Sequence, residues 1–524
     1  MYFQVRTIIK AVAVTAVALS LGGFGPSTIA ASAASPRSAP AQFGHAAPPR
    51  GHAPRRRGFV TPTSCSSPGS PSFVGVTGAS NVAGGMYAAV LGGTMNQACD
   101  AFSAIGGGNG NAIGNSGAAS NSMIGGGESN AITGAATFIG AGYSNSSSGD
   151  DSAVAAGAFN SAGADDTFVG SGLQNVASAS GSFVGAGGSV ADATGAGKNT
   201  ASGEDAFVGA GDVNTASGNG AFVGGGGFEI AVSATGPVLG NTASGTDSFI
   251  GAGDMNNIVA DQSFIGGGQS NRILAGATLA AIGGGDGNVV SGKYGAVTGG
   301  EGNLVSGTVA AVPGGYHNVA SGSASFAAGY VAEALTNGSF AWSDESSSTV
   351  HVRTTVANQF VARAAGGVDF YSNSALTSGV RLAPGAGVWG SLSDRTMKTG
   401  VVPLDDAAVL AKVAALPVSE WSYTSERGVR HVGPMAQDFY AAFGVGEDDR
   451  HITSIDEDGV ALAAIKALHA ENMQLRAKDV KTDADLIEMR ERLDSLRSRD
   501  AARLADLERK VAALTNLVAS HAGR

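Results

Sequence analysis

An apolar residue followed by glycine or alanine recurs along the middle of the chain, mostly in steps of 15 residues. The recurring residues are Val90, Ile105, Ile124, Ile139, Val154, Val169, Val184, Val208, Val223, Ile250, Ile265, Ile282, Val297 and Val312. An asparagine stands six residues after most of them, and glycines at fixed positions permit tight corners with positive φ. This period predicts a parallel β-solenoid whose 15-residue coils stack on one another, with the asparagines forming a ladder.

The strand-like pairs of this repeat are apolar at both positions. In Phe207-Val208, for example, the two side chains must point to opposite faces of a strand. One face fills the interior of the coil, and the other needs a partner outside it. We therefore expect the solenoid to self-associate.

The repeat unit, of which Ala206 to Gly218 is a clear copy, has the pattern apolar-Gly-x-Gly-x-x-Asn-x-Ala-Ser-Gly. This pattern resembles the head repeats of YadA-like trimeric autotransporter adhesins, and the resemblance covers residues 70–342. It implies a left-handed parallel β-roll that packs as a homotrimer, and an external ligand such as a host surface, matrix or glycan. We find no counterpart of the membrane-anchor strands of those adhesins and expect no anchoring of that kind.

The N-terminus has the order of a secretory signal peptide. Arg6 and Lys10 precede an apolar run, and Ala31-Ser32-Ala33 offers a small-x-small cleavage site, which predicts a signal peptide over 1–33. A membrane anchor is the alternative, but the run is shorter than the ~20 residues that span a bilayer. We expect an extracellular or cell-surface product with no transmembrane segment in the mature chain. Residues 34–69 are rich in Pro, Ala and Arg and predict a disordered linker.

The two cysteines of the chain are Cys65 and Cys99. Export would favour a disulfide between them. The sequence does not show whether their Cα atoms come close enough, so the pairing stays open at this point.

Charge and histidine spacing exclude several classes of function. From residue 61 to 342 there are three Lys and Arg against 17 Asp and Glu, which would repel nucleic acid. The eight histidines show no metal-binding spacing, so we expect no metal and no cofactor.

After the repeats, an alternating pattern from Thr349 to Leu382 predicts a β-rich neck over 343–392. A more highly charged sequence follows, and it begins with Ser393-Asp394-x-x-x-Lys398.

Residues 393–524 resemble the peptidase S74 family, the intramolecular chaperone domain of phage tail spikes and endosialidases. The resemblance rests on that motif, on His431-Val432-Gly433-Pro434-Met435-Ala436-Gln437-Asp438, on Asp456-Glu457-Asp458-Gly459-Val460-Ala461 and on a long terminal helix. It implies a domain that assembles three chains and then releases itself by cutting the Leu392–Ser393 bond. Ser393 would be the nucleophile and Lys398 the general base.

The chemistry of such a pair is reasonable without the family. A serine hydroxyl needs an adjacent base, and lysine serves as one when its pKa is lowered. Lys398 considered alone is more typical of a solvated surface charge. His431 and Gln437 are candidates to support the site, although a packing or hydrogen-bonding role fits them equally well. The expected activity is a single cut in the chain itself, with no turnover of other substrates.

Heptad positions along the C-terminus predict a coiled coil over about 465–518. Positions a are Ile465, Asn472, Asp479, Leu486 and Leu493, and positions d are Leu468, Leu475, Thr482, Met489 and Leu496. An amphipathic helix packed on its own domain is the alternative. The predicted fold class is mainly β: a trimeric solenoid head, a β-rich neck, and an α+β chaperone domain that ends in this helix.

Three functions fit these features. The first is an exported homotrimeric adhesin-like head with a self-releasing chaperone. The second is a polysaccharide-binding or polysaccharide-degrading spike, although the repeats carry no distinctive pair of carboxylates. The third is a structural surface or fibre protein that keeps its chaperone domain.

Overall fold

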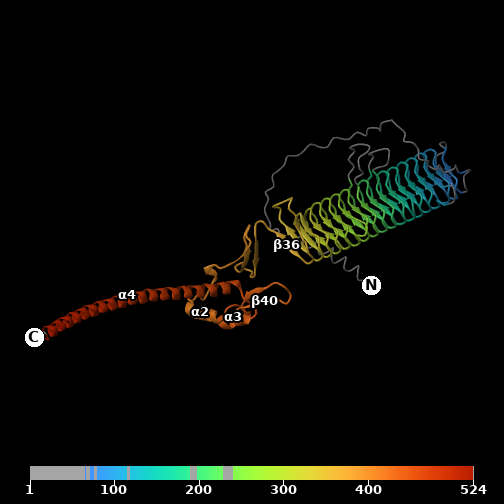
Figure 1. Ribbon diagram of the computed structural model, residues 1–524. Coiled ribbons are helices and arrows are strands. Elements are labelled where there is room, and N and C mark those ends of the chain that lie inside the picture. Colours follow the sequence, from blue (N-terminus) through green and yellow to red (C-terminus); the bar gives the residue numbers. More distant parts are fainter. Residues whose placement is uncertain are drawn as a thin grey trace, which may run out of the picture. The chain divides into compact units, whose positions relative to one another are not determined.

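The computed structural model describes residues 65, 71–75, 80–114, 118–188, 197–227 and 240–522. The predicted signal peptide and nearly all of the predicted linker lie outside these residues. The described part is mainly β, as predicted: a parallel β-solenoid is followed by a short region of strands and helices and by one long helix (Figure 1).

Two ladders of parallel strands form the solenoid. Along most of the solenoid, each coil contributes one strand to each ladder. The first ladder contains β1 (Phe73–Val74), β3 (Ala89–Val90), β5 (Ala104–Ile105), β7 (Met123–Ile124), β9 (Phe138–Ile139), β11 (Ala153–Val154), β13 (Phe168–Val169), β15 (Phe183–Val184), β17 (Phe207–Val208), β19 (Phe222–Val223), β21 (Phe249–Ile250), β23 (Phe264–Ile265), β25 (Ala281–Ile282), β27 (Ala296–Val297), β29 (Ala311–Val312), β30 (Gly315–Tyr316), β32 (Phe326–Tyr330), β34 (Phe340–Ser343) and β36 (Phe360–Arg363).

The second ladder is built in the same way from the other strand of each coil. It contains β2 (Val82–Ala83), β4 (Gln97–Ala98), β6 (Ala112–Ile113), β8 (Ala131–Ile132), β10 (Ser146–Ser147), β12 (Ser161–Ala162), β14 (Val176–Ala177), β16 (Thr200–Ala201), β18 (Thr215–Ala216), β20 (Thr242–Ala243), β22 (Asn257–Ile258), β24 (Arg272–Ile273), β26 (Val289–Val290), β28 (Leu304–Val305), β31 (Val319–Ala320), β33 (Ala332–Ala334) and β35 (Val352–Arg353).

Stacking in register explains why the repeat needs glycine. In the first ladder Phe207 pairs with Phe222, and Val208 with Val223, so equivalent residues of successive coils lie one above the other. Gly211 has φ +95°, and a Cβ there would lie 2.0 Å from the carbonyl oxygen of Gly226 in the next coil. A side chain at that corner would hold the two coils apart.

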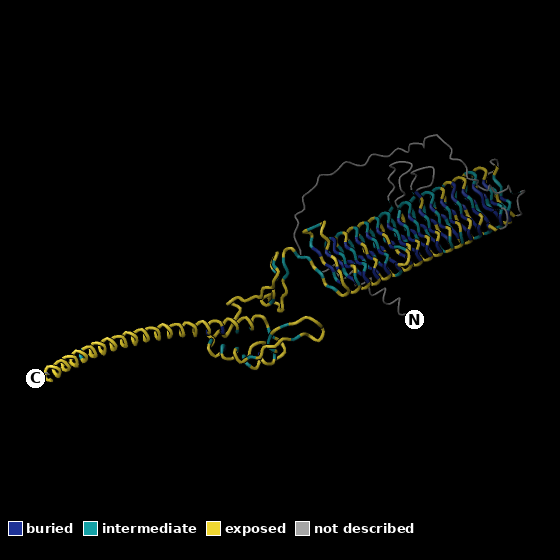
Figure 2. The backbone as a smooth tube through the Cα atoms, in the orientation of Figure 1, coloured by how far each residue is buried: buried dark blue, intermediate teal, exposed yellow. Residues whose placement is uncertain are grey.

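The interior of the solenoid is filled by the second residue of nearly every strand. All the recurring valines and isoleucines are buried, and Figure 2 shows the buried positions repeating along the coils. Buried asparagines form the predicted ladder: Asn271 N–H donates to Asn256 Oδ1 at 3.1 Å, and Asn256 Nδ2 donates to the carbonyl oxygen of Gly268 at 2.9 Å. Each amide therefore joins the backbone of its neighbouring coil at two points.

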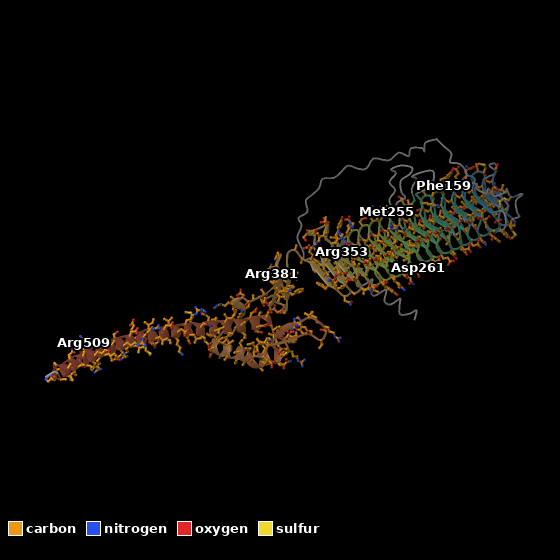
Figure 3. All side chains as sticks on the ribbon, in the orientation of Figure 1. Phe159, Met255, Asp261, Arg353, Arg381 and Arg509 are labelled. Atoms are coloured by element: carbon orange, nitrogen blue, oxygen red, sulfur yellow. A yellow bond between two sulfur atoms is a disulfide. The ribbon has the colours of Figure 1, made fainter. Side chains whose placement is uncertain are left out.

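Many corners place residues other than glycine at positive φ. Met255 has φ +57° in one set of corners, and Gln262, which follows Asp261, has φ +55° in the other. Met255 and Asp261 lie near opposite edges of the solenoid (Figure 3). Even the β-branched Val309 has φ +57°, a conformation that such residues rarely adopt. The stacking of the coils fixes these corners more strongly than local preference does.

Ion pairs close the C-terminal end of the parallel ladders. Arg363 Nε donates to Asp344 Oδ1 at 2.9 Å, and hydrogen bonds from Ser346 first, then from Ala365 and Arg363, hold the pKa of Asp344 well below its ordinary value. Burial raises the pKa of Glu333, but His351 and Arg353 outweigh it, so that this pKa is lowered. Strand β36 pairs in parallel with β34 as far as Arg363, so parallel pairing continues into the segment predicted as the neck.

The remaining elements are short except for the last. An antiparallel sheet contains β37 (Val368–Tyr371), β38 (Gly379–Leu382) and β39 (Trp389–Ser391). A single 3₁₀ turn, η1 (Arg395–Met397), follows, and then come α2 (Asp406–Ala415), β40 (Ser419–Trp421), β41 (His431–Gly433), α3 (Ala436–Phe443) and α4 (Ser454–His521). The predicted heptads lie within α4, one continuous helix of 68 residues.

Candidate functional site

The candidate site begins where β39 ends. Ser393 is the second residue after this strand, and η1 turns the chain between Ser393 and Lys398. Asp394 starts the turn: its Oδ1 accepts hydrogen bonds from the backbone N–H and the hydroxyl of Thr396, both at 2.7 Å. These two bonds, the hydroxyl bond first, lower the pKa of the Asp394 carboxyl, so its charged form caps the turn.

The turn brings the two predicted catalytic side chains together. Lys398 Nζ donates a hydrogen bond to Ser393 Oγ at 2.6 Å. This is the distance at which a neutral lysine can remove a serine proton. Both residues are exposed in the single chain, and Leu392, on the other side of the predicted scissile bond, is 43% exposed.

His431 and Gln437 lie on other elements. His431 begins β41, stacks on Trp421 with ring centroids 4.9 Å apart, and approaches Glu426 at 3.4 Å. Gln437 is an exposed residue in the first turn of α3. Among the hydrogen bonds and ion pairs of residues 240–522, none joins His431 or Gln437 to Ser393 or Lys398. Their supporting role stays a prediction.

The role of Asp394 was missed by the sequence reasoning. The signal was present, because an aspartate two residues before a threonine at the start of a turn is a common capping arrangement. Trp421 stacks on His431, and its buried Nε1 has no hydrogen-bond partner in the described part of the chain.

Helices α2, α3 and α4 form a small packed module around buried Val409, Phe439 and Ala463. Lys466 Nζ in α4 bonds Asp406 Oδ2 in α2 at 2.7 Å. Farther along α4 the heptad residues have no such cover: Leu486 is 57% exposed and Leu493 is 48% exposed. An apolar stripe of this kind on a long helix is typical of a coiled-coil seam without its partners.

Residues 393–445 match the family model Peptidase_S74, described as the chaperone of endosialidase. The match begins at Ser393, the residue that the geometry pairs with Lys398. It indicates a trimerisation chaperone in a spike-like protein and so implies that three chains assemble. A search of curated proteins finds no match to this chain.

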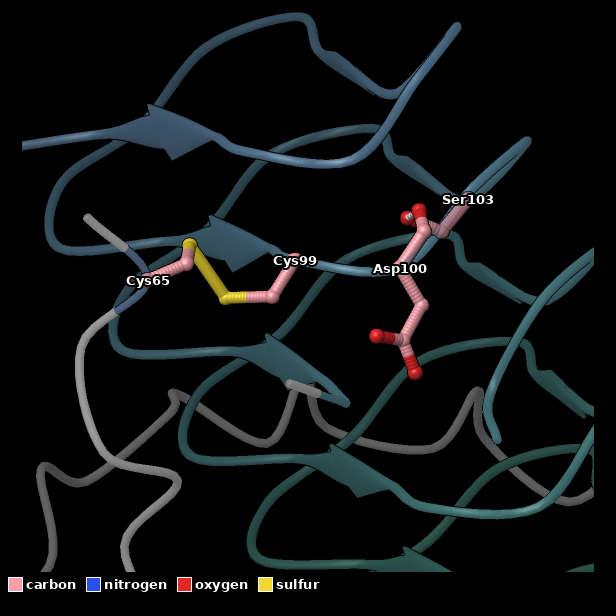
Figure 4. Close-up of a disulfide and its surroundings, with 4 residues drawn as sticks. All are labelled: Cys65, Cys99, Asp100 and Ser103. Carbon is pink, nitrogen blue, oxygen red and sulfur yellow. Dashed lines mark hydrogen bonds between the residues drawn. A yellow bond between two sulfur atoms is a disulfide. The ribbon is translucent and has the colours of Figure 1, made fainter. Parts of the chain in front are cut away.

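The two cysteines meet near the first coils of the solenoid. Cys65 and Cys99 are joined in a disulfide with their Cα atoms 5.7 Å apart (Figure 4). Cys99 directly follows β4, and the next residue, Asp100, accepts a hydrogen bond from Ser103 at its backbone carbonyl oxygen. The bridge thus ties Cys65 to the end of β4 in the second ladder.

Two kinds of feature are absent from the described residues. They hold no cluster of three or more His, Cys, Asp or Glu side chains arranged to bind a metal ion. They also include no helix that is both long and apolar enough to cross a membrane.

Proposed function

We propose that this chain is an exported homotrimeric head protein whose C-terminal module assembles three chains and then releases itself by cutting the Leu392–Ser393 bond. The observation that carries the cleavage proposal is the 2.6 Å hydrogen bond from Lys398 Nζ to Ser393 Oγ, at the first residue of the chaperone match. The exposed seam of α4 supports the assembly proposal. The resemblance of the repeats to adhesin heads supports a surface location and a ligand on a host surface, matrix or glycan.

The cut can be written with these residues alone. Ser393 Oγ adds to the carbonyl carbon of Leu392 while Lys398 Nζ takes the hydroxyl proton. The C–N bond then breaks, the proton passes to the leaving amino group of Ser393, and Leu392 remains as an ester on Oγ. Water hydrolyses the ester, which frees the Leu392 carboxylate and restores the hydroxyl.

Because Ser393 and Lys398 are exposed in the single chain, we expect the cut to depend on assembly of the trimer. Lysine accepts a proton only in its neutral form, and water around an exposed ammonium group favours the charged form. Neighbouring chains that exclude water from Lys398 would favour the neutral amine that the reaction needs. We therefore expect cutting to follow trimer formation, so that release of the chaperone makes assembly hard to reverse.

The test is intact-mass measurement combined with light scattering on wild type, Ser393→Ala, Lys398→Arg and the control Ser391→Ala. Wild type and Ser391→Ala should yield a fragment that begins at Ser393, because Ser391 has no part in the chemistry. Ser393→Ala and Lys398→Arg should form uncut trimers, because one lacks the nucleophile and arginine stays protonated. An uncut wild-type trimer, or a cut Ser393→Ala chain, would refute the cleavage proposal.

A further inference from the structure

The outward-facing position of the first ladder is apolar in every coil. It is the first residue of each strand other than β30 and will be called the outer apolar row. Its members are Phe73, Ala89, Ala104, Met123, Phe138, Ala153, Phe168, Phe183, Phe207, Phe222, Phe249, Phe264, Ala281, Ala296, Ala311, Phe326, Phe340 and Phe360.

Phenylalanines in the middle of this row stack into a continuous ladder. From Phe168 to Phe264, successive ring centroids are 4.7 to 5.3 Å apart and the ring planes are within 16° of parallel at every step. Each ring also leans over the glycine two residues later: a Cβ on Gly209 would lie 3.4 Å from the Phe207 ring. The glycines therefore let the rings lie flat along the strand.

The outer apolar row leaves apolar surface in water. Phe138 and Phe264 are 43% exposed, and Phe168 and Phe249 are 36% exposed. With about 200 Å² for a whole phenylalanine side chain, these four rings alone expose about 300 Å². The largest apolar patch on an ordinary monomer is about 300–600 Å² and is often functional, and the outer apolar row extends beyond these four rings.

The second ladder differs at the equivalent outward position. Its outward residues in the middle coils are polar in most strands, namely Ser146, Ser161, Thr200, Thr215, Thr242, Asn257 and Arg272. Only one of the two ladders therefore presents a continuous uncharged apolar face.

We infer that the outer apolar row is the face through which each solenoid packs against the other two copies of this chain. The inference rests on the proposed homotrimer and names the surface that the head uses in it. A second copy of this chain fits the row better than an unrelated protein does, because its own coils carry apolar residues at the same spacing along the whole row. The abundant acidic side chains of the solenoid would repel one another between copies, and the outer apolar row is a face that contains none of them.

The test compares the accessibility of two thiols introduced in one coil of the full-length chain, by Phe222→Cys in the outer apolar row and by Thr215→Cys in the second ladder. Both positions are half-buried in the single chain, so a monomer should react with a maleimide at similar rates at the two sites. Alanine already occupies the row at positions such as Ala281, so a small side chain there is compatible with the fold.

In a trimer confirmed by light scattering, the thiol of the Phe222→Cys variant should react at least about tenfold more slowly than the thiol of the Thr215→Cys variant. Loss of the trimer in Phe222→Cys alone would equally support the inference. Equal rates in two intact trimers, or selective protection at position 215, would overturn it. A monomeric wild type would instead refute the proposed homotrimer, which separates the two failures.

Discussion

Replacing Asn256 by alanine tests whether the buried amide ladder holds the coils together. In the native chain its Nδ2 donates to the carbonyl oxygens of Ala252 at 3.2 Å and Gly268 at 2.9 Å, and its Oδ1 accepts the Asn271 N–H at 3.1 Å. Losing the two donated bonds costs about 1 kcal/mol each, and leaving a buried N–H without an acceptor costs about 1–3 kcal/mol. We expect a local destabilisation of about 3–5 kcal/mol.

The assay is hydrogen exchange of the peptides that contain Asn271, compared between Asn256→Ala and the adjacent control Asn257→Ala. A loss of about 3 kcal/mol corresponds to exchange faster by about two orders of magnitude where opening is at equilibrium. Asn257 is half-buried, and its Oδ1 is buried without a hydrogen-bond partner among the described residues, so its replacement removes no hydrogen bond at that oxygen and should change exchange little. Equal effects of the two substitutions would refute the reasoning, because they would show that the ladder bonds contribute nothing beyond the loss of an amide.

Two further predictions concern charged groups. Asp394→Ala should slow self-cleavage roughly fivefold, because it loosens the turn that presents Lys398. Asp394→Asn should retain most of the rate, because its amide oxygen still accepts hydrogen bonds from Thr396. Gel densitometry against time measures both rates, and equal rates in the two variants would exclude a capping role. Because the folded pKa of Glu333 is lowered, its ion pairs stabilise β35 above the ordinary glutamate pKa and are lost as pH falls through the lower folded value. The protection of the β35 amides, measured relative to their intrinsic exchange rates at each pH, should therefore fall in acid in wild type, and a Glu333→Gln variant with the same loss of protection would contradict this.

Periodicity predicted the solenoid well because a single rule is repeated many times. The apolar positions at Val208 and its equivalents and the amide ladder at Asn256 follow from register alone. The positive-φ corners at Val309 and Tyr87 did not follow, because local preference disfavours them and only the stacked coils impose them. The sequence also did not predict where parallel pairing ends, since β36 joins the first ladder without carrying the repeat motif.

At the candidate site, the sequence predicted which residues take part but not the contacts that hold them in place. The spacing of Ser393 and Lys398 is common by chance, and the 2.6 Å contact depends on a turn held by Asp394. The surroundings of His431 could not be predicted either. A strand pairing places it opposite Trp421, and cross-strand pairings of this kind depend on a hairpin register that the sequence leaves open.

The outer apolar row, the α4 seam and the Ser393/Lys398 pair share one property: each is exposed in a single chain and suited to burial. The three differ in what burial requires, and this suggests an order of events. Joining the seams of α4 needs only a locally formed helix, whereas joining two apolar rows needs long stacked ladders already in register. The coiled coil should form first and raise the local concentration of the solenoids. Cleavage then comes last, because it would otherwise separate the heads from the element that brings them together.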